Sequence, residues 1–171
     1  MKKMKRLVAV LLAGIMALAM LTACGGTPST PVTRDDALEK SVAEWAVEWG
    51  KGANLELTED TTLTTISEKC LPGMVKAYDA FIANNQTAYN AAVAETKTAF
   101  NAAKNGRNVA PVDVLFLNME VTKETLAAAI QQNAGKFQKL LKDAGVENPA
   151  KFGVTVTKQD QYTLVLFMVS E

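Results

Sequence analysis

Two carboxylates, Glu44 and Glu48, are the residues whose type and spacing come closest to catalysis. They are four positions apart, so on a helix they lie one turn apart, beside Trp45 and Trp49. A carboxylate pair can act as general acid and base, as in glycoside hydrolysis. Such a pair is more often a solvated helix face, and we favour that interpretation. A small cell-envelope hydrolase that uses carboxylates is the alternative.

The side chains that other catalytic centres need are sparse. The chain has no histidine, which removes histidine-dependent serine and cysteine triads and most catalytic zinc sites. Ser67-Glu68-Lys69 lacks the Ser-x-x-Lys spacing of penicillin-binding enzymes, and isolated glycines form no phosphate-binding loop. We therefore expect no catalytic residues, no cofactor, and a binding protein more than an enzyme.

A small acidic group, Glu56, Glu59 and Asp60, is the one candidate for a cation. It lacks the alternating oxygen ligands and the glycine of a calcium loop. Acidic residues also stabilise a helix N-terminus, which explains this group without a metal. We expect no metal site.

The first 24 residues have the composition of an export signal. Four basic residues within Met1–Arg6 precede an apolar run of 15 residues, Leu7–Leu21, which is short for a membrane-spanning helix of about 20 residues. Leu21-Thr22-Ala23-Cys24 follows, and this segment resembles the lipobox of bacterial lipoproteins. The resemblance implies cleavage between Ala23 and Cys24 and a diacylglycerol on Cys24. The alternatives are an uncleaved anchor or an ordinary signal cut elsewhere.

The same resemblance implies a location on the extracytoplasmic face of a cell membrane. Gly25 and Gly26 follow the cysteine without the acidic residue that favours inner-membrane retention, which leaves the outer membrane open in a two-membrane cell. In a one-membrane cell the protein would lie on the outer face of that membrane. The 148 residues after the cut carry 14 basic and 18 acidic side chains, a net charge of −4. This charge argues against nucleic acid. The expected partners are the membrane, through the lipid, and an envelope protein.

We expect three parts: a signal peptide at 1–23, a flexible tether at 24–32 and a single α+β domain at 33–171. Cys70 is the cysteine that remains within the domain. We interpret it as a small buried hydrophobe, with an intermolecular disulfide as the alternative.

The first half of the domain is predicted to be helical. A helix over 34–49, capped by Thr33 with Asp36 in capping-box position, carries an apolar stripe that includes both tryptophans. We interpret the stripe as a core face, with an aromatic platform for sugar or peptide as the alternative. Residues 54–65 fit either strands or the start of a helix running to Cys70.

An internal repeat of 11 residues places Tyr78, Tyr89 and Phe100 at equivalent positions. Because 11 residues make nearly three helical turns, these rings would share one face of a helix over 72–104, starting at Pro72. The helix either continues or breaks at Asn84–Asn85. Its face is a possible interaction surface for a partner helix, and packing on the domain's own sheet is the alternative.

The last third alternates strand, helix, strand and strand. We predict a strand over 112–121, a helix over 123–143 capped by Thr122, strands over 152–157 and 162–169, and a hairpin at 158–161. The fold class is α+β, with helices on both faces of a small mixed sheet of three to four strands. A crossover makes the first two of these strands parallel, with the last between them. This plan resembles the CAP superfamily in architecture alone, and no site residue is carried over.

Together these features predict a membrane-anchored, non-enzymatic binding or protein-interaction module. The carboxylate hydrolase and a small-ligand-binding lipoprotein are the alternatives.

Overall fold

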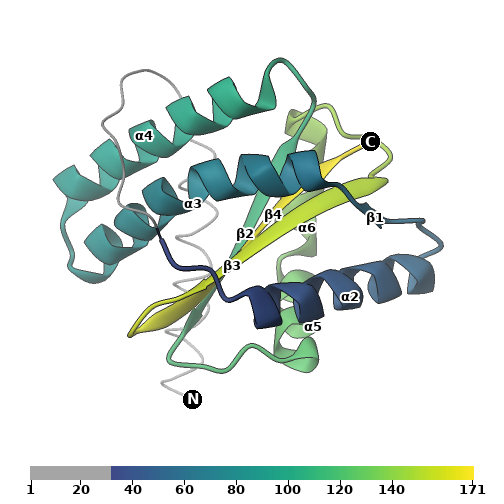
Figure 1. Ribbon diagram of the computed structural model, residues 1–171, viewed down its shortest axis with the longest axis horizontal. Coiled ribbons are helices and arrows are strands. Elements are labelled where there is room, and N and C mark those ends of the chain that lie inside the picture. Colours follow the sequence, from purple (N-terminus) through teal and green to yellow (C-terminus); the bar gives the residue numbers. More distant parts are fainter. Residues whose placement is uncertain (1–31) are drawn as a thin grey trace.

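A four-stranded mixed sheet lies at the centre of the computed structural model, which describes residues 32–171 (Figure 1). The strand order is β1-β3-β4-β2, and β4 is antiparallel to both β3 and β2. β2 and β3 therefore run parallel on either side of β4, as predicted. The elements are α2 (Asp36–Gly52), β1 (Thr58–Glu59), α3 (Thr61–Ile82), α4 (Gln86–Lys104), β2 (Ala110–Leu117), α5 (Lys123–Gln132), α6 (Ala134–Asp143), β3 (Lys151–Lys158) and β4 (Tyr162–Ser170).

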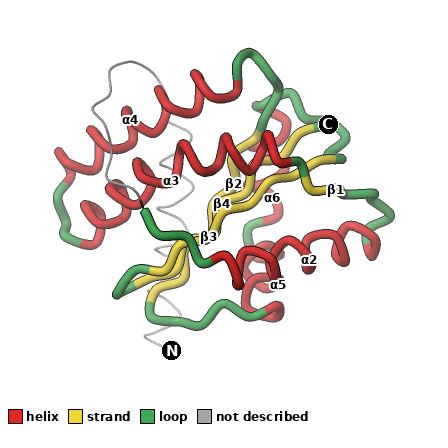
Figure 2. The backbone as a smooth tube through the Cα atoms, in the orientation of Figure 1, coloured by secondary structure: helices red, strands yellow, loops and turns green. Residues whose placement is uncertain are grey.

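Helices cover both faces of this sheet, which confirms the α+β class (Figure 2). Alternate side chains of each strand point to opposite faces. On β2, Val112, Val114 and Phe116 pack toward α2, α5 and α6, whereas Leu115 packs toward α3 and α4. Burial on both faces explains why β2 and β4 read as nearly continuous apolar runs. The predicted signal peptide and residues 24–31 of the tether lie outside the described residues.

The α3–α4 hairpin settles one alternative left open by the sequence and corrects one predicted helix start. The chain breaks at Asn84, whose φ of 54° is left-handed, and Asn85 caps α4 by accepting a hydrogen bond from the Ala88 N–H at 3.0 Å. Pro72, however, lies inside α3 and does not start a helix. Its missing N–H leaves the Glu68 carbonyl without a helical donor. Buried apolar side chains before and after Pro72 hold the helix against the sheet across that point.

Three predicted boundaries of helices and strands are wrong, because residues next to them cap or end the element at another position. Asp35, and not Thr33, caps α2, because its carboxylate accepts from the Leu38 N–H at 3.0 Å. Asn133 separates α5 from α6 where one helix was predicted, and its side chain donates to the Ala129 carbonyl at 2.8 Å. Asn118 adopts a φ of 49° directly after β2, so this strand ends at Leu117 and not at Val121. The Thr122 cap of α5 is confirmed.

The first described residues are fastened to the edge of β3, and we call this arrangement the N-terminal clasp. The Asp35 N–H donates to the Val156 carbonyl at 2.8 Å, and the Thr157 hydroxyl donates to the Thr33 carbonyl at 2.8 Å. Arg34 pairs with Glu39 of α2 and with Glu68 of α3. Glu39 in turn accepts from the Val156 N–H at 3.2 Å. The clasp thus joins the start of the domain to two helices and a strand.

Candidate functional site

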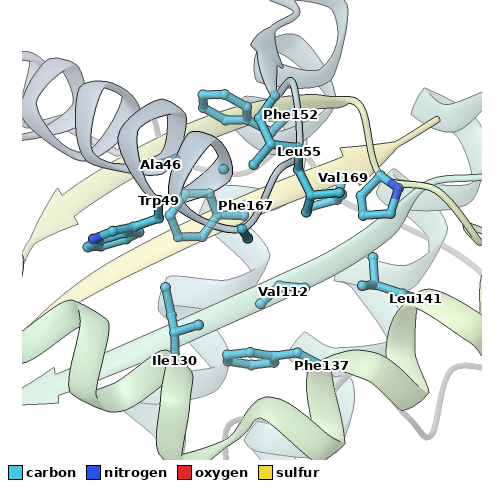
Figure 3. Close-up of a pocket in the computed structure, with 14 residues that line it drawn as sticks. Ala46, Trp49, Leu55, Val112, Ile130, Phe137, Leu141, Phe152, Phe167 and Val169 are labelled. Carbon is cyan, nitrogen blue, oxygen red and sulfur yellow. The ribbon is translucent and has the colours of Figure 1, made fainter.

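An apolar pocket of about 290 Å³ opens between α2 and the α5–α6 pair, over one end of the sheet (Figure 3). Trp49 lines it from α2, and Ile130, Phe137 and Leu141 line it from α5 and α6. Side chains from three adjacent strands form its floor. The complete lining is Ala46, Trp49, Gly50, Ala53, Leu55, Leu57, Val112, Ile130, Phe137, Leu141, Pro149, Phe152, Phe167 and Val169.

The pocket exists because the helices on this face pack on the sheet and scarcely on each other. α2 contacts mainly β3, whereas α5 and α6 contact β2 on the other side of the central strand β4. The residues that α2 presents to the gap include Ala46 and Gly50, which are too small to fill it. Leu55 extends the apolar surface outward and is 38% exposed. The result is an apolar concavity next to an exposed leucine.

At the end of α2 and along β4, the backbone next to the pocket is already hydrogen-bonded. The end of α2 turns back on itself, so the Trp49 and Gly50 carbonyls accept from the Ala53 N–H at 3.0 Å, and Gly50 also accepts from Leu55 at 2.8 Å. β4 is paired along its length with β3 and β2. A ligand in this pocket therefore meets hydrocarbon, with little to accept or donate a hydrogen bond.

A second hollow, of about 620 Å³, lies at the opposite end of the sheet. It is formed by the start of α2, the β2–α5 loop and the β3–β4 hairpin. Its lining mixes Met119 with the carboxylates of Asp35, Glu120 and Asp160. No group of three or more acidic, cysteine or histidine side chains within residues 32–171 is placed to hold a metal ion.

The carboxylates considered from the sequence have other surroundings. Glu44 and Glu48 are exposed on α2, and Glu48 accepts a hydrogen bond from Lys123 Nζ at 2.6 Å. Asp60 caps α3 and accepts from the Thr62 N–H at 2.7 Å. Its slight burial opposes the charged form, but this bond and a second from the Leu63 N–H lower the pKa of Asp60. Glu44 and Glu48 thus lie on a solvated helix face, and Asp60 stabilises a helix N-terminus, which are the interpretations favoured from the sequence.

The repeat residues do not form one exposed face, which corrects the possible interaction surface at Tyr78, Tyr89 and Phe100. Because the helix breaks at Asn84, Tyr78 lies on α3 and the other two lie on α4. Tyr78 and Phe100 are buried in the core beneath the hairpin, at 1% and 5% exposure. Tyr89 is half-buried, and its ring lies 6.3 Å from that of Phe81.

A buried carboxylate beneath the hairpin escaped the sequence analysis. Asp113 of β2 accepts a hydrogen bond from the Tyr78 hydroxyl through one oxygen. Its other oxygen and Lys97 Nζ are buried without a hydrogen-bond partner in the described part of the chain. Burial raises the pKa of Asp113 to about 7 and also raises that of Tyr78. The sequence could have indicated this buried carboxylate, because Asp113 is the one charged residue in an otherwise apolar strand.

Cys70 is buried in the same core, as expected, at 2% exposure. It is a free thiol, and burial raises its pKa to about 12. A thiol that stays protonated and covered is a poor nucleophile. The Trp45 and Trp49 side chains are half-buried and pack against the opposite core, so the core-face interpretation of their stripe is confirmed.

No helix within residues 32–171 has both the length and the apolar character needed to cross a membrane. No protein-family model, curated protein or solved structure is similar enough to this chain to assign it to a family.

Proposed function

We propose that this protein is a non-enzymatic binding module, held at the outer face of a membrane by a lipid on Cys24, that captures an apolar group in the α2–α6 pocket. The wholly apolar lining of that pocket carries the proposal. Ligand pockets are usually apolar concavities, and this one is near the lower end of their range of roughly 300–1,000 Å³. Apolar cavities of smaller volume stay dry and bind small hydrocarbons.

The pocket is also open enough to be used. Leu55 and the half-buried Trp49 form an apolar rim that a ligand can reach from solvent. Binding there needs no catalytic group, which agrees with the exposed, solvated positions of Glu44 and Glu48. The alternative of a carboxylate hydrolase has no comparable support from geometry.

Titration with an uncharged, polarity-sensitive fluorophore tests the binding site. We expect saturable binding that Leu55→Asp weakens by about fivefold or more, since a carboxylate at the rim must be desolvated. Met119→Asp is the matched control, because Met119 is also 38% exposed but lines the opposite hollow. Equal effects of the two substitutions, or no saturable binding, would contradict the proposal.

The anchor has a separate test. Mass spectrometry of the protein extracted from membranes should find a diacylglyceryl group on Cys24, and Cys24→Ala should release the protein from the membrane. An unmodified cysteine in a membrane-bound protein would show that the lipid part of the proposal is wrong.

A further inference from the structure

The pocket discriminates against peptide and in favour of plain hydrocarbon. A peptide segment would bring N–H and C=O groups, and each one buried without a partner loses its hydrogen bonds to water. The pocket offers such groups few partners, because its side chains are hydrocarbon apart from the indole N–H of Trp49, the end of α2 is hydrogen-bonded to itself and β4 is paired on both sides. An alkyl chain has no hydrogen bonds to lose.

The start of the described chain lies away from this pocket. The N-terminal clasp holds Thr33 and Asp35 against Val156 and Thr157, near the far end of β3. The pocket floor includes Phe152, five residues earlier on the same strand, which is about 17 Å away at 3.3 Å per residue. If Cys24 carries the anchor, the tether joins the domain at the end that faces away from the pocket.

We propose that the α2–α6 pocket binds the single alkyl chain of a water-borne amphiphile and leaves its polar head in solvent. This inference rests on the proposed function and names the ligand class of that site. The pocket opens at the end of the sheet opposite the clasp, so a ligand dissolved in the aqueous phase can reach it. The domain's own acyl chains are not the occupant, since transfer from bilayer to pocket exchanges one hydrocarbon environment for another and gains nothing.

The size of the pocket sets a chain-length limit. Each methylene that enters contributes about 0.8 kcal/mol, so affinity should rise about fourfold per carbon. With about 290 Å³ available, the rise should stop once the pocket is full. A plateau in affinity along a series of unbranched chains is therefore the signature of an alkyl site of fixed depth.

The two tryptophans of the chain make a matched pair of probes. Trp49 lines the pocket, whereas Trp45 lies one turn earlier on α2 and does not. The full-length protein is reconstituted into phospholipid vesicles as Trp45→Phe, which keeps Trp49, and as Trp49→Phe, which keeps Trp45. Terminally brominated alkanoates of increasing length are then titrated, since bromine quenches tryptophan on contact.

We expect saturable quenching of Trp49, affinity that rises with chain length and then levels, and little quenching of Trp45. Absence of saturable quenching, or equal quenching of both tryptophans, would overturn the proposal. Vesicles made with brominated phospholipid test whether the alkyl chain comes from the bilayer instead. Quenching of Trp49 in such vesicles would mean that the pocket takes bilayer lipid. If the fluorophore binds and the alkanoates do not, the alkyl ligand is wrong while the proposed function stands. If neither binds, both fail.

Discussion

The α3–α4 hairpin seals one face of the sheet, whereas α2, α5 and α6 leave a gap on the other. On the sealed face the backbones come very close: a Cβ at Gly153 would lie 2.1 Å from the Thr64 nitrogen, and one at Gly73 would lie 2.3 Å from Thr96 Oγ1. On the open face the helices stand on different strands with the pocket between them. One sheet thus supports a closely packed layer of helices on one face and leaves an apolar pocket on the other.

This division predicts that the most damaging small change is on the sealed face. Gly153→Ala places a methyl group against the backbone of the first turn of α3, so that helix has to move. We expect a loss of roughly 3 kcal/mol or more in the free energy of unfolding, measured by urea denaturation. Gly135→Ala is the control, because a Cβ there meets nothing within 4 Å. A similar stability for both variants would show that the contact at Gly153 is looser than described.

A matched pair of leucines compares the two faces directly. Leu166 is fully buried beneath the hairpin, whereas Leu141 is half-buried at the pocket. We expect Leu166→Ala to cost about 2–5 kcal/mol through lost burial and a new cavity. Leu141→Ala should cost less than about 1.5 kcal/mol, because it enlarges a space that already opens to solvent. If urea denaturation shows the same loss of unfolding free energy for both variants, the two faces are packed equally tightly and the comparison fails.

Asp113, on the sealed face, makes the free energy of unfolding depend on pH. Its pKa is raised in the folded protein from 3.8 to about 7 by burial, so between these values the folded state binds more protons than the unfolded state. Its contribution to stability is therefore greatest below pH 4, is lost as the pH rises through about 7, and is constant above that.

Asp113→Asn should remove this dependence, because the amide carries no charge at any pH. Relative to the wild type, the variant should gain stability between pH 6 and pH 8, by an amount on the order of 1–3 kcal/mol. Urea denaturation at a series of pH values measures the difference, and Asp160→Asn, in the β3–β4 turn, is the exposed control. A difference between variant and wild type that does not change with pH would contradict the raised pKa.

Thiol labelling compares access to the two faces through the reaction rate of a cysteine on each. Cys70 should react with a maleimide only when the hairpin opens, because it is buried and its pKa is raised to about 12. Leu141→Cys places a second thiol at the pocket, where reagent can enter. We expect one rapid and one slow modification by mass spectrometry. Rapid labelling of Cys70 in the wild type would show that the hairpin does not seal this face.

The sequence predicted the elements whose patterns are local. The apolar runs of β2 and β4, the Thr122 cap and the β3–β4 hairpin depend on neighbouring residues, so the strand order of the last third followed from them, although the end of β2 and the break between α5 and α6 did not. Pro72 was misplaced because a proline favours a helix start locally, while packing on the sheet carried α3 through it. The pocket could not be predicted, because its lining joins α2, α6 and three strands that are distant in sequence.

The N-terminal clasp has a mechanical consequence. A pull on the chain before Thr33 acts first on Val32, which packs at the edge of the core, and then on a few polar contacts: the two hydrogen bonds to β3 and the ion pairs of Arg34. The polar contacts lie outside the hydrophobic core, and each can break while the sheet remains intact. Under tension the residues up to Asp35 should detach from β3 before the rest of the domain unfolds, so the clasp would be the first part of the fold to yield.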